Sequence, residues 1–162
     1  MPATRFLEIH DLLTLATVRV GLPGSSKEDV LRNLINLLEG HPSVRDIEEV
    51  RAAIFQRESM MSTGVGKELA LPHAKTSGVT ESVAAFAVTA EPIDYGSIDN
   101  EPVRLIFLLV GTEAAKSEHI KMLSRVSRLM NRDRFREQLL RASSPSDVIE
   151  TFREGESDLL DG

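Results

Sequence analysis

The chain has 162 residues, of which 41% are hydrophobic and 4% aromatic, with a formal net charge of −6 and no cysteine. Its length and apolar content fit one compact domain, so we expect residues 1–162 to form a single folded unit. The acidic charge argues against DNA or RNA as a partner, because phosphate backbones need a basic face. Without cysteine, disulfides and thiolate metal sites are excluded.

The ends and the apolar runs of the chain favour a cytoplasmic protein. The first residues contain no apolar core followed by a cleavage site, so no signal peptide is predicted. The longest apolar run, residues 105–110, is much too short to cross a bilayer and suits a buried strand. We therefore expect no direct insertion into a membrane.

The first third of the chain is predicted to hold one strand and two helices. Residues 16–20 alternate weakly and are rich in β-formers, so they favour a short strand. Ser25 and Glu28 have the spacing of a capping box for a helix that ends at Gly40. Its apolar stripe comprises Val30, Leu31, Leu34, Ile35, Leu37 and Leu38. A second helix is predicted from about Ser43, with an inner face formed by Ile47, Val50, Ile54 and Met61.

The remainder of the chain is predicted to alternate strands and then continue as helices. Residues 83–88 and 103–110 are nearly continuous apolar runs, typical of strands covered on both faces, with an exposed connection at 91–102. Three helices follow, one capped by Ser117, one around Phe135 and Leu139, and one that opens at Ser144-Pro145. Buried strands framed by amphipathic helices predict an α/β fold. We expect the acidic tail, residues 154–162, to be flexible.

The strongest chemical signal lies in residues 62–74. A loop with two glycines runs into a short apolar segment that ends in Pro72-His73. Proline restricts its own φ and biases the preceding residue towards an extended conformation, so the imidazole is held stiffly. Because histidine titrates near neutral pH, we predict that His73 is a nucleophile that carries a phosphoryl group. A purely structural histidine at a strand end is the alternative.

Further residues are predicted to support this phosphoryl group. The backbone N–H groups and small hydroxyls of one loop suit an anion, and a simple tight turn is the alternative for it. The loop residues are Ser62, Thr63, Gly64 and Gly66. His119, near the start of its helix, would donate a hydrogen bond as a neutral imidazole, or would be a packed core histidine. Arg57, at a helix end, would neutralise charge on the phosphoryl oxygens, or would be a surface charge.

Several other kinds of site do not fit the sequence. A nucleotide-binding P-loop would need glycine at position 61 and serine or threonine at 68, where the chain has Met61 and Glu68. The chain has no Gly-x-Ser-x-Gly elbow for a serine hydrolase. Metal binding by His73 and His119 with carboxylates is conceivable, but no local ligand spacing favours it. We predict neither a metal nor a cofactor.

Three motifs in combination resemble a known family. They are Arg57-Glu58-x-x-x-Ser62-Thr63-Gly64-Val65-Gly66, then Ala70-Leu71-Pro72-His73-Ala74-Lys75, and then His119-Ile120-Lys121-x-Leu123-Ser124. Together they resemble the EIIA domains of the bacterial phosphotransferase system, fructose/mannitol class, and the similarity extends from about residue 6 to residue 152. The resemblance implies a mixed β-sheet flanked by helices. It also implies that His73 is phosphorylated, at Nε2, with His119 and Arg57 as supporting residues.

Within this family, Ile98-Asp99-Asn100 is similar to the nitrogen-regulatory (PtsN-like) branch, because sugar-specific members usually have Ser-Asp-Gly there. We also expect no attached EIIB or membrane domain. Glu68 stands where the family often has glycine. We expect this acid to lie near the phosphate site and to alter its electrostatics.

The resemblance implies a transferase component that takes its phosphoryl group from a small histidine phosphocarrier protein. It would act in a phosphotransferase relay, with an EIIB-type acceptor, or in nitrogen/potassium-type regulation of a target protein. The alternative is a non-catalytic binding module whose partner binding is switched by His73 phosphorylation, because a phosphate adds negative charge to an interface. A metal- or ligand-binding stress protein is a third and weaker interpretation.

Overall fold

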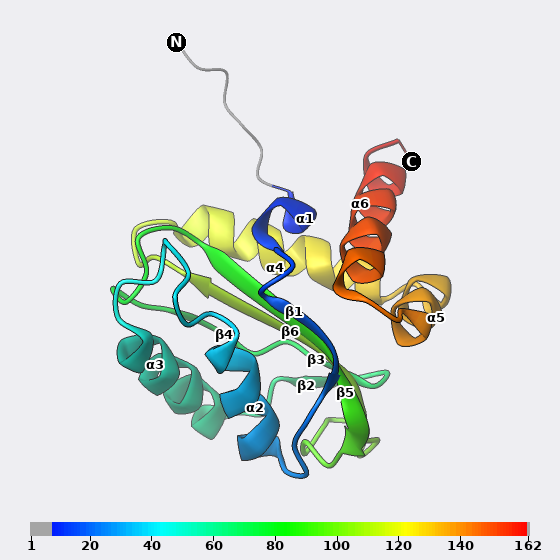
Figure 1. Ribbon diagram of the computed structural model, residues 1–162, viewed down its shortest axis with the longest axis horizontal. Helices are drawn as coiled ribbons and strands as arrows, with labels where there is room; N and C mark the ends of the chain where they lie inside the picture. Colours follow the sequence, from blue (N-terminus) through cyan, green and yellow to red (C-terminus); the bar gives the residue numbers. More distant parts are fainter. Residues whose placement is uncertain (1–7, 162) are drawn as a thin grey trace.

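The computed structural model describes residues 8–161 and shows one sheet with helices on both faces (Figure 1). The helices of this range are α1 Ile9–Leu12, α2 Lys27–Asn36, α3 Ile47–Met60, α4 Lys116–Met130, α5 Asp133–Arg141 and α6 Pro145–Asp161. The strands are β1 Val18–Leu22, β2 Gly64–Gly66, β3 Leu69–Ala70, β4 His73–Lys75, β5 Val83–Ile93 and β6 Val103–Gly111. None of these helices is both long and apolar enough to cross a membrane.

The sheet is mixed, as expected. Its order is β1-β5-β6-β3-β2, and β4 also pairs with β6. The two long strands β5 and β6 are antiparallel, whereas β1 is parallel to β5, and β3 and β4 are parallel to β6.

Alternation along the central strands divides the core into two layers, because successive side chains of a strand point to opposite faces. In β6, Ile106 and Leu108 pack with α2 and α3, whereas Leu105 and Phe107 pack on the other face. That second face is covered by α1, α4, α5 and α6 (Figure 1). A helix from either layer can therefore reach the edge of the sheet.

The strand that carries His73 lies at this edge. β3 and β4 follow one another along the same side of β6, where Leu69 pairs with Leu105 and His73 pairs with Leu109. β2 flanks β3 but, within the described range, no strand pairs with the outer side of β4. Pro72 separates β3 and β4, and its carbonyl accepts the N–H of Leu109 at 3.0 Å. An edge strand leaves backbone N–H and C=O groups unpaired along one side.

Helix starts differ from the expected positions by one to four residues. Ser26, and not Ser25, caps α2, because its hydroxyl accepts the N–H of Asp29 at 3.2 Å. Asp46 caps α3, so this helix begins later than residue 43. Met61 follows the last residue of α3 and is 70% exposed, so its assignment to the inner face was wrong.

The connection at 91–102 is also less exposed than expected. β5 continues to Ile93, which is buried with Tyr95 in the layer below α2 and α3. The many turn-forming residues of this segment favoured an exposed connection, so the burial of the apolar side chains between them was not predicted.

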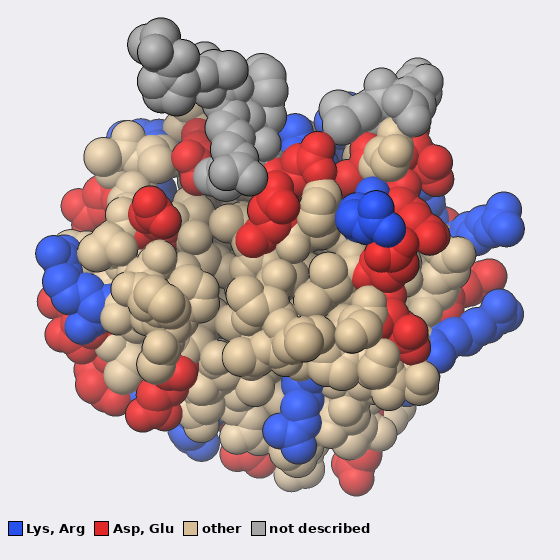
Figure 2. All heavy atoms as spheres, turned by 45° about the horizontal axis from the view of Figure 1, so that its top comes forward, with Lys and Arg blue, Asp and Glu red and all other residues tan. Residues whose placement is uncertain are grey.

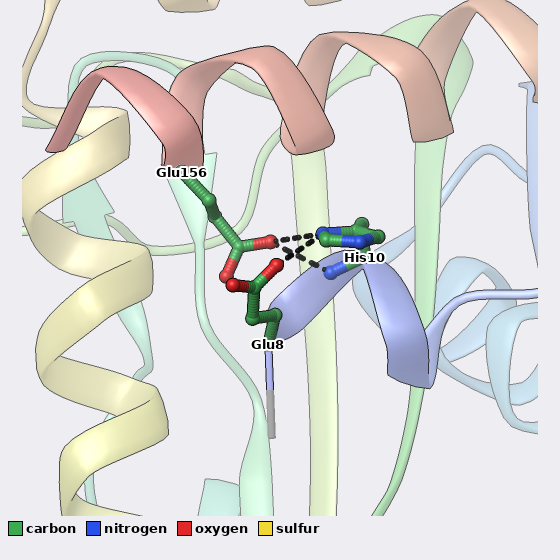
Figure 3. Close-up of side chains that lie close together, drawn as sticks. All are labelled: Glu8, His10 and Glu156. Carbon is green, nitrogen blue, oxygen red and sulfur yellow. Dashed lines mark hydrogen bonds and ion pairs between the residues drawn. The ribbon is translucent and has the colours of Figure 1, made fainter. Parts of the chain in front are cut away.

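The acidic C-terminal segment is helical over the described residues. α6 extends through Asp161, so residues 154–161 form helix and not the flexible tail expected from their charge. Figure 2 shows acidic side chains along α6, but Glu156 is only 1% exposed. Its carboxylate accepts the N–H groups of Ile9 and His10 at 2.6 and 2.8 Å, and the His10 ring lies against it (Figure 3). This carboxylate binds α1 to α6.

Candidate active site

The predicted reactive side chains meet in one hollow of about 480 Å³ at the β4 edge of the sheet, here called the His73 hollow. Its walls come from α3 on one face of the sheet and α4 on the other, with β4 between them. The lining residues are Ala53, Gln56, Arg57, Met60, His73, Ala74, Lys75, His119, Ile120 and Leu123. His73, His119 and Arg57, which are far apart in sequence, are thus brought together.

His73 is half-buried at the start of β4, and its Nδ1 lies 2.7 Å from the carbonyl oxygen of Leu71. A carbonyl only accepts hydrogen bonds, so Nδ1 carries the proton and Nε2 keeps the lone pair of the neutral ring. The pKa of His73 is lowered, chiefly because burial disfavours imidazolium, and the positive charge of Arg57 adds to this. The Leu71 carbonyl and the charge of Glu58 act in the opposite direction. The ring is therefore a neutral nucleophile at ordinary pH.

His119 lies in the first turns of α4 and is 4% exposed. Its ring centroid is 5.8 Å from that of His73, and the two ring planes are inclined by 51°. Burial lowers the pKa of His119 to about 4, with the positive charges of His73 and Lys75 as further causes. His119 is therefore neutral at pH 7, and a neutral imidazole has one N–H to donate.

Arg57 lies in the last turn of α3, as predicted. Its Nη1 donates a 3.0 Å hydrogen bond to the carbonyl oxygen of Met61, just beyond the helix end. This bond satisfies one of the terminal carbonyls that a helix leaves without partners. The guanidinium has further N–H groups for an oxyanion in the His73 hollow.

The glycine loop occupies a different place from the one predicted. Gly64 and Gly66 belong to β2, which pairs with β3, and none of Ser62, Thr63, Gly64 or Gly66 is among the lining residues of the His73 hollow. The N–H of Thr63 donates to Glu58 at 2.7 Å, and that of Gly64 donates to the Ser62 hydroxyl at 3.1 Å. These groups are used within the fold, so we do not include them in the candidate site.

A buried carboxylate behind Arg57 joins α3 to the strands. Glu58 accepts hydrogen bonds from the N–H and hydroxyl of Thr63 and from the Tyr95 hydroxyl, the last at 2.5 Å. Lys27 of α2 lies 3.6 Å from the same carboxylate. This network fixes the turn between α3 and β2. The sequence motif contains Arg57 and Glu58 side by side, but it did not predict that Glu58 is buried in a network.

Glu68 is not beside His73. Leu69, its neighbour, pairs with β6 four positions before His73 does, which is about 13 Å along the sheet. Among the described residues, one group could offer three metal ligands, namely Glu8, His10 and Glu156 (Figure 3). It lies outside the His73 hollow, and the Glu156 carboxylate already accepts two backbone N–H groups.

Most of the lining residues were not predicted as site residues, and Lys75, Met60 and Ile120 are the notable ones among them. Lys75 follows His73 by two positions, so strand alternation places it on the same side of β4, and it was quoted only as part of a motif. Met60 and Ile120 are 72% and 65% exposed although they are apolar. Apolar side chains exposed at the rim of a site are typical of a protein contact.

Comparison with known proteins identifies the family of this chain. The family described as phosphoenolpyruvate-dependent sugar phosphotransferase system, EIIA 2, matches residues 11–155. The chain is 32% identical, over 91% of its length and 96% of the relative, to a fructose-specific EIIA component of Haloferax volcanii. It is 35% identical to a fructose-specific EIIABC component of Bacillus subtilis, of which it spans 23%.

A solved structure of a nitrogen regulatory protein is also similar to this chain. The nitrogen regulatory protein IIA-Ntr of Neisseria meningitidis has a TM-score of 0.83 and 32% identity, and the match covers 89% of this chain and 98% of that one. The chain therefore belongs to the EIIA family of the phosphoenolpyruvate-dependent sugar phosphotransferase system.

Proposed function

We propose that this chain is a phosphohistidine carrier and that Nε2 of His73 accepts the phosphoryl group. The observation that carries this proposal is the 2.7 Å contact between His73 Nδ1 and the Leu71 carbonyl. It assigns the ring proton to Nδ1 and the nucleophilic lone pair to Nε2. Family membership supports the proposal, and so does the position of the ring in a hollow at a sheet edge.

The step is a balanced exchange. The lone pair of Nε2 forms the new N–P bond, while the N–P bond to the donor histidine breaks and its electron pair returns to the donor imidazole. Because one phosphoramidate replaces another, the chain mainly needs to position the groups and stabilise charge on the oxygens. The phosphorylated ring carries positive charge while Nδ1 keeps its proton, and the hydrogen bond from Nδ1 to the Leu71 carbonyl stabilises that charge.

Two lining residues are proposed to stabilise the phosphoryl oxygens. Arg57 contributes a permanent positive charge and several N–H groups in a planar fork that suits oxyanions. His119 contributes one N–H from a ring that stays neutral, so the donor is available throughout the physiological pH range. Preorganised donors of this kind act without reorganisation when charge develops.

The proposed donor is a small histidine phosphocarrier protein, and the proposed acceptor is an EIIB-type domain. Met60 and Ile120 stand exposed on α3 and α4, one on each side of the His73 hollow. A protein that covers them would bury apolar surface and bring its own phosphorylated side chain over His73. A substitution such as Ile120→Glu is expected to slow transfer from the donor protein, whereas Leu15→Glu, at an equally exposed site elsewhere, is not.

The test is phosphorylation by the donor system with phosphoenolpyruvate. The unmodified chain and a His41→Ala control should both take up one acid-labile phosphate, seen by intact mass, and His73→Ala should take up none. Equal acid-labile labelling of the His73→Ala variant would remove this residue from the role.

A regulatory switch is the second candidate, and the exposed rim favours it. The phosphoryl oxygens on His73 would place about −1.5 to −2 charges between Met60 and Ile120, only partly offset by the positive charge of the ring, and so oppose an apolar contact. Onward delivery of phosphate to an EIIB cysteine would support a relay. Stable binding of a target in only one phosphorylation state would support the switch, which is the mode proposed for a member of the nitrogen-regulatory branch.

A further inference from the structure

A glycine at the end of the central strand lies directly against the His119 ring. Gly111 is the last residue of β6, and a Cβ atom added there would be 2.8 Å from Nδ1 of His119. Real Cβ contacts are essentially never this short. Any side chain at position 111 would therefore displace the ring or the strand.

The backbone at Gly111 does not itself require glycine. Its φ lies outside the left-handed region, unlike that of Gly66 or Gly96. Gly111 ends a strand whose other residues are almost all large and buried, and glycine in a strand often marks a site where another group approaches closely.

Both sides of the contact are held, so the ring is the part that would have to move. The carbonyl of Gly111 accepts the N–H of Thr76 at 2.9 Å, which ties β6 to the end of β4. α4 is anchored in the core by Met122 and Val126, which are buried one and two turns after His119.

The contact also defines which nitrogen of His119 donates. Nδ1 is buried and has no hydrogen-bond partner in residues 8–161, and Cγ and Cε1 are the next nearest ring atoms to the added Cβ, at 3.6 and 3.7 Å. Nε2 therefore lies on the far side of the ring. Buried N–H groups without an acceptor are rarer than buried acceptors without a donor, so the proton belongs on Nε2.

We infer that Gly111 is a positioning residue, whose missing side chain lets His119 sit in the wall of the His73 hollow with Nε2–H as its donor. This inference rests on the proposed function of His73 for its effect on transfer. The position of the ring is independent of that function and can be measured separately.

The test compares Gly111→Ala with the unmodified chain, with Gly155→Ala as the matched control. Gly155, in α6, would place its Cβ 2.6 Å from Phe135, so this control creates a similar steric conflict away from the His73 hollow. We expect Gly111→Ala to slow phosphoryl transfer by about 10- to 100-fold, the range expected when a catalytic group is misplaced by about 1 Å. Gly155→Ala is expected to lower stability and leave the transfer rate unchanged.

The second measurement is a titration of the His119 ring by NMR, which needs no phosphoryl transfer. In Gly111→Ala the ring should move towards solvent, so its pKa should rise from about 4 towards the ordinary value of 6.5. The Gly155→Ala control should leave it near 4. If Gly111→Ala left both the pKa of His119 and the transfer rate unchanged, the inference would be overturned.

A double variant separates action through His119 from a general effect on the fold. His119→Ala removes the ring, so adding Gly111→Ala should cause no further loss of rate and little further loss of stability. If the rate losses of the two single variants multiplied in the double variant, Gly111 would act independently of His119, and the inference would be contradicted. If His73 proved not to be phosphorylated, the proposed function would fail, while the NMR titration would still decide whether Gly111 positions the ring.

Discussion

The hydroxyl of Tyr95 donates a 2.5 Å hydrogen bond to the carboxylate of Glu58, across 37 positions of sequence. Burial and the neighbouring Glu58 raise the pKa of Tyr95, so the phenol remains a donor. With Thr63 and Lys27 also directed at it, this carboxylate joins α2, α3, β2 and the segment after β5. It stabilises the turn that follows Arg57.

We predict that Glu58→Ala lowers the free energy of unfolding by about 3–5 kcal/mol, because the partly buried Lys27 and the buried donors of Thr63 and Tyr95 lose their partner. Glu48→Ala is the control on the same helix. Its carboxylate is largely exposed and its one ion pair within residues 8–161 is with Arg51, so about 1 kcal/mol or less is expected. Urea unfolding of both variants measures the difference, and equal losses would contradict the role given to Glu58.

Loss of the second histidine should slow transfer and preserve the fold. His119→Ala removes one preorganised donor, for which we expect a decrease of about 10- to 1000-fold in the rate of phosphoryl transfer. Rapid-quench measurement with pre-phosphorylated donor protein gives the rate, and far-ultraviolet circular dichroism checks the fold. A rate equal to that of the unmodified chain would leave His119 with a packing role only.

His119 should also make the protein less stable in acid. Its folded pKa of about 4 lies below the unfolded value of 6.5, so below pH 6.5 the unfolded chain binds more protons. The resulting stability is fully present above pH 6.5 and falls as the pH approaches 4, by about 3 kcal/mol. A glutamine side chain is always neutral. Between pH 7 and pH 4 the His119→Gln variant should therefore lose about 3 kcal/mol less free energy of unfolding than the unmodified chain, as measured by denaturant unfolding. Parallel curves for the two proteins would refute the assignment.

The lowered pKa of His73 predicts that the rate of phosphoryl transfer decreases at a lower pH than it would for an ordinary histidine. Its neutral, nucleophilic form persists to a lower pH than that of an ordinary histidine, so the pH at which single-turnover transfer falls to half its maximum should lie below 6.5. The donor protein's own pH dependence must be measured with a second acceptor and divided out. A rate that halves at or above pH 6.5 would show that the ring is not desolvated.

The Glu156 carboxylate should hold the first described helix in place. Glu156→Ala leaves the N–H groups of Ile9 and His10 without their acceptor, and we expect a loss of about 1–3 kcal/mol. Amide exchange at these two residues should accelerate more than in α4. Glu150→Ala, an exposed position on the same helix paired with Arg153, serves as the control and should change neither quantity measurably.

Local patterns in the sequence predicted most of the elements and three of the side chains that line the His73 hollow. Apolar periodicity identified α2 and α4, and nearly continuous apolar runs identified β5 and β6. His73, His119 and Arg57 were chosen for chemistry that depends on residue type and on position at an element end, and the structure places them in one hollow. These features are local, because they arise from backbone geometry and from the face that each element must bury.

The tertiary structure alone decided which groups have partners. The N–H groups of the glycine loop looked available for a phosphate, but the first of them donates to Glu58. The tail looked flexible because it is acidic, but Glu156 is buried against Ile9, 147 positions away. Gly111 has no special feature in the sequence beyond its place at the end of a strand, but in the structure it lies against the His119 ring. Charge, spacing and periodicity describe one segment at a time, whereas a hydrogen bond or a steric contact depends on a second segment that only folding brings near.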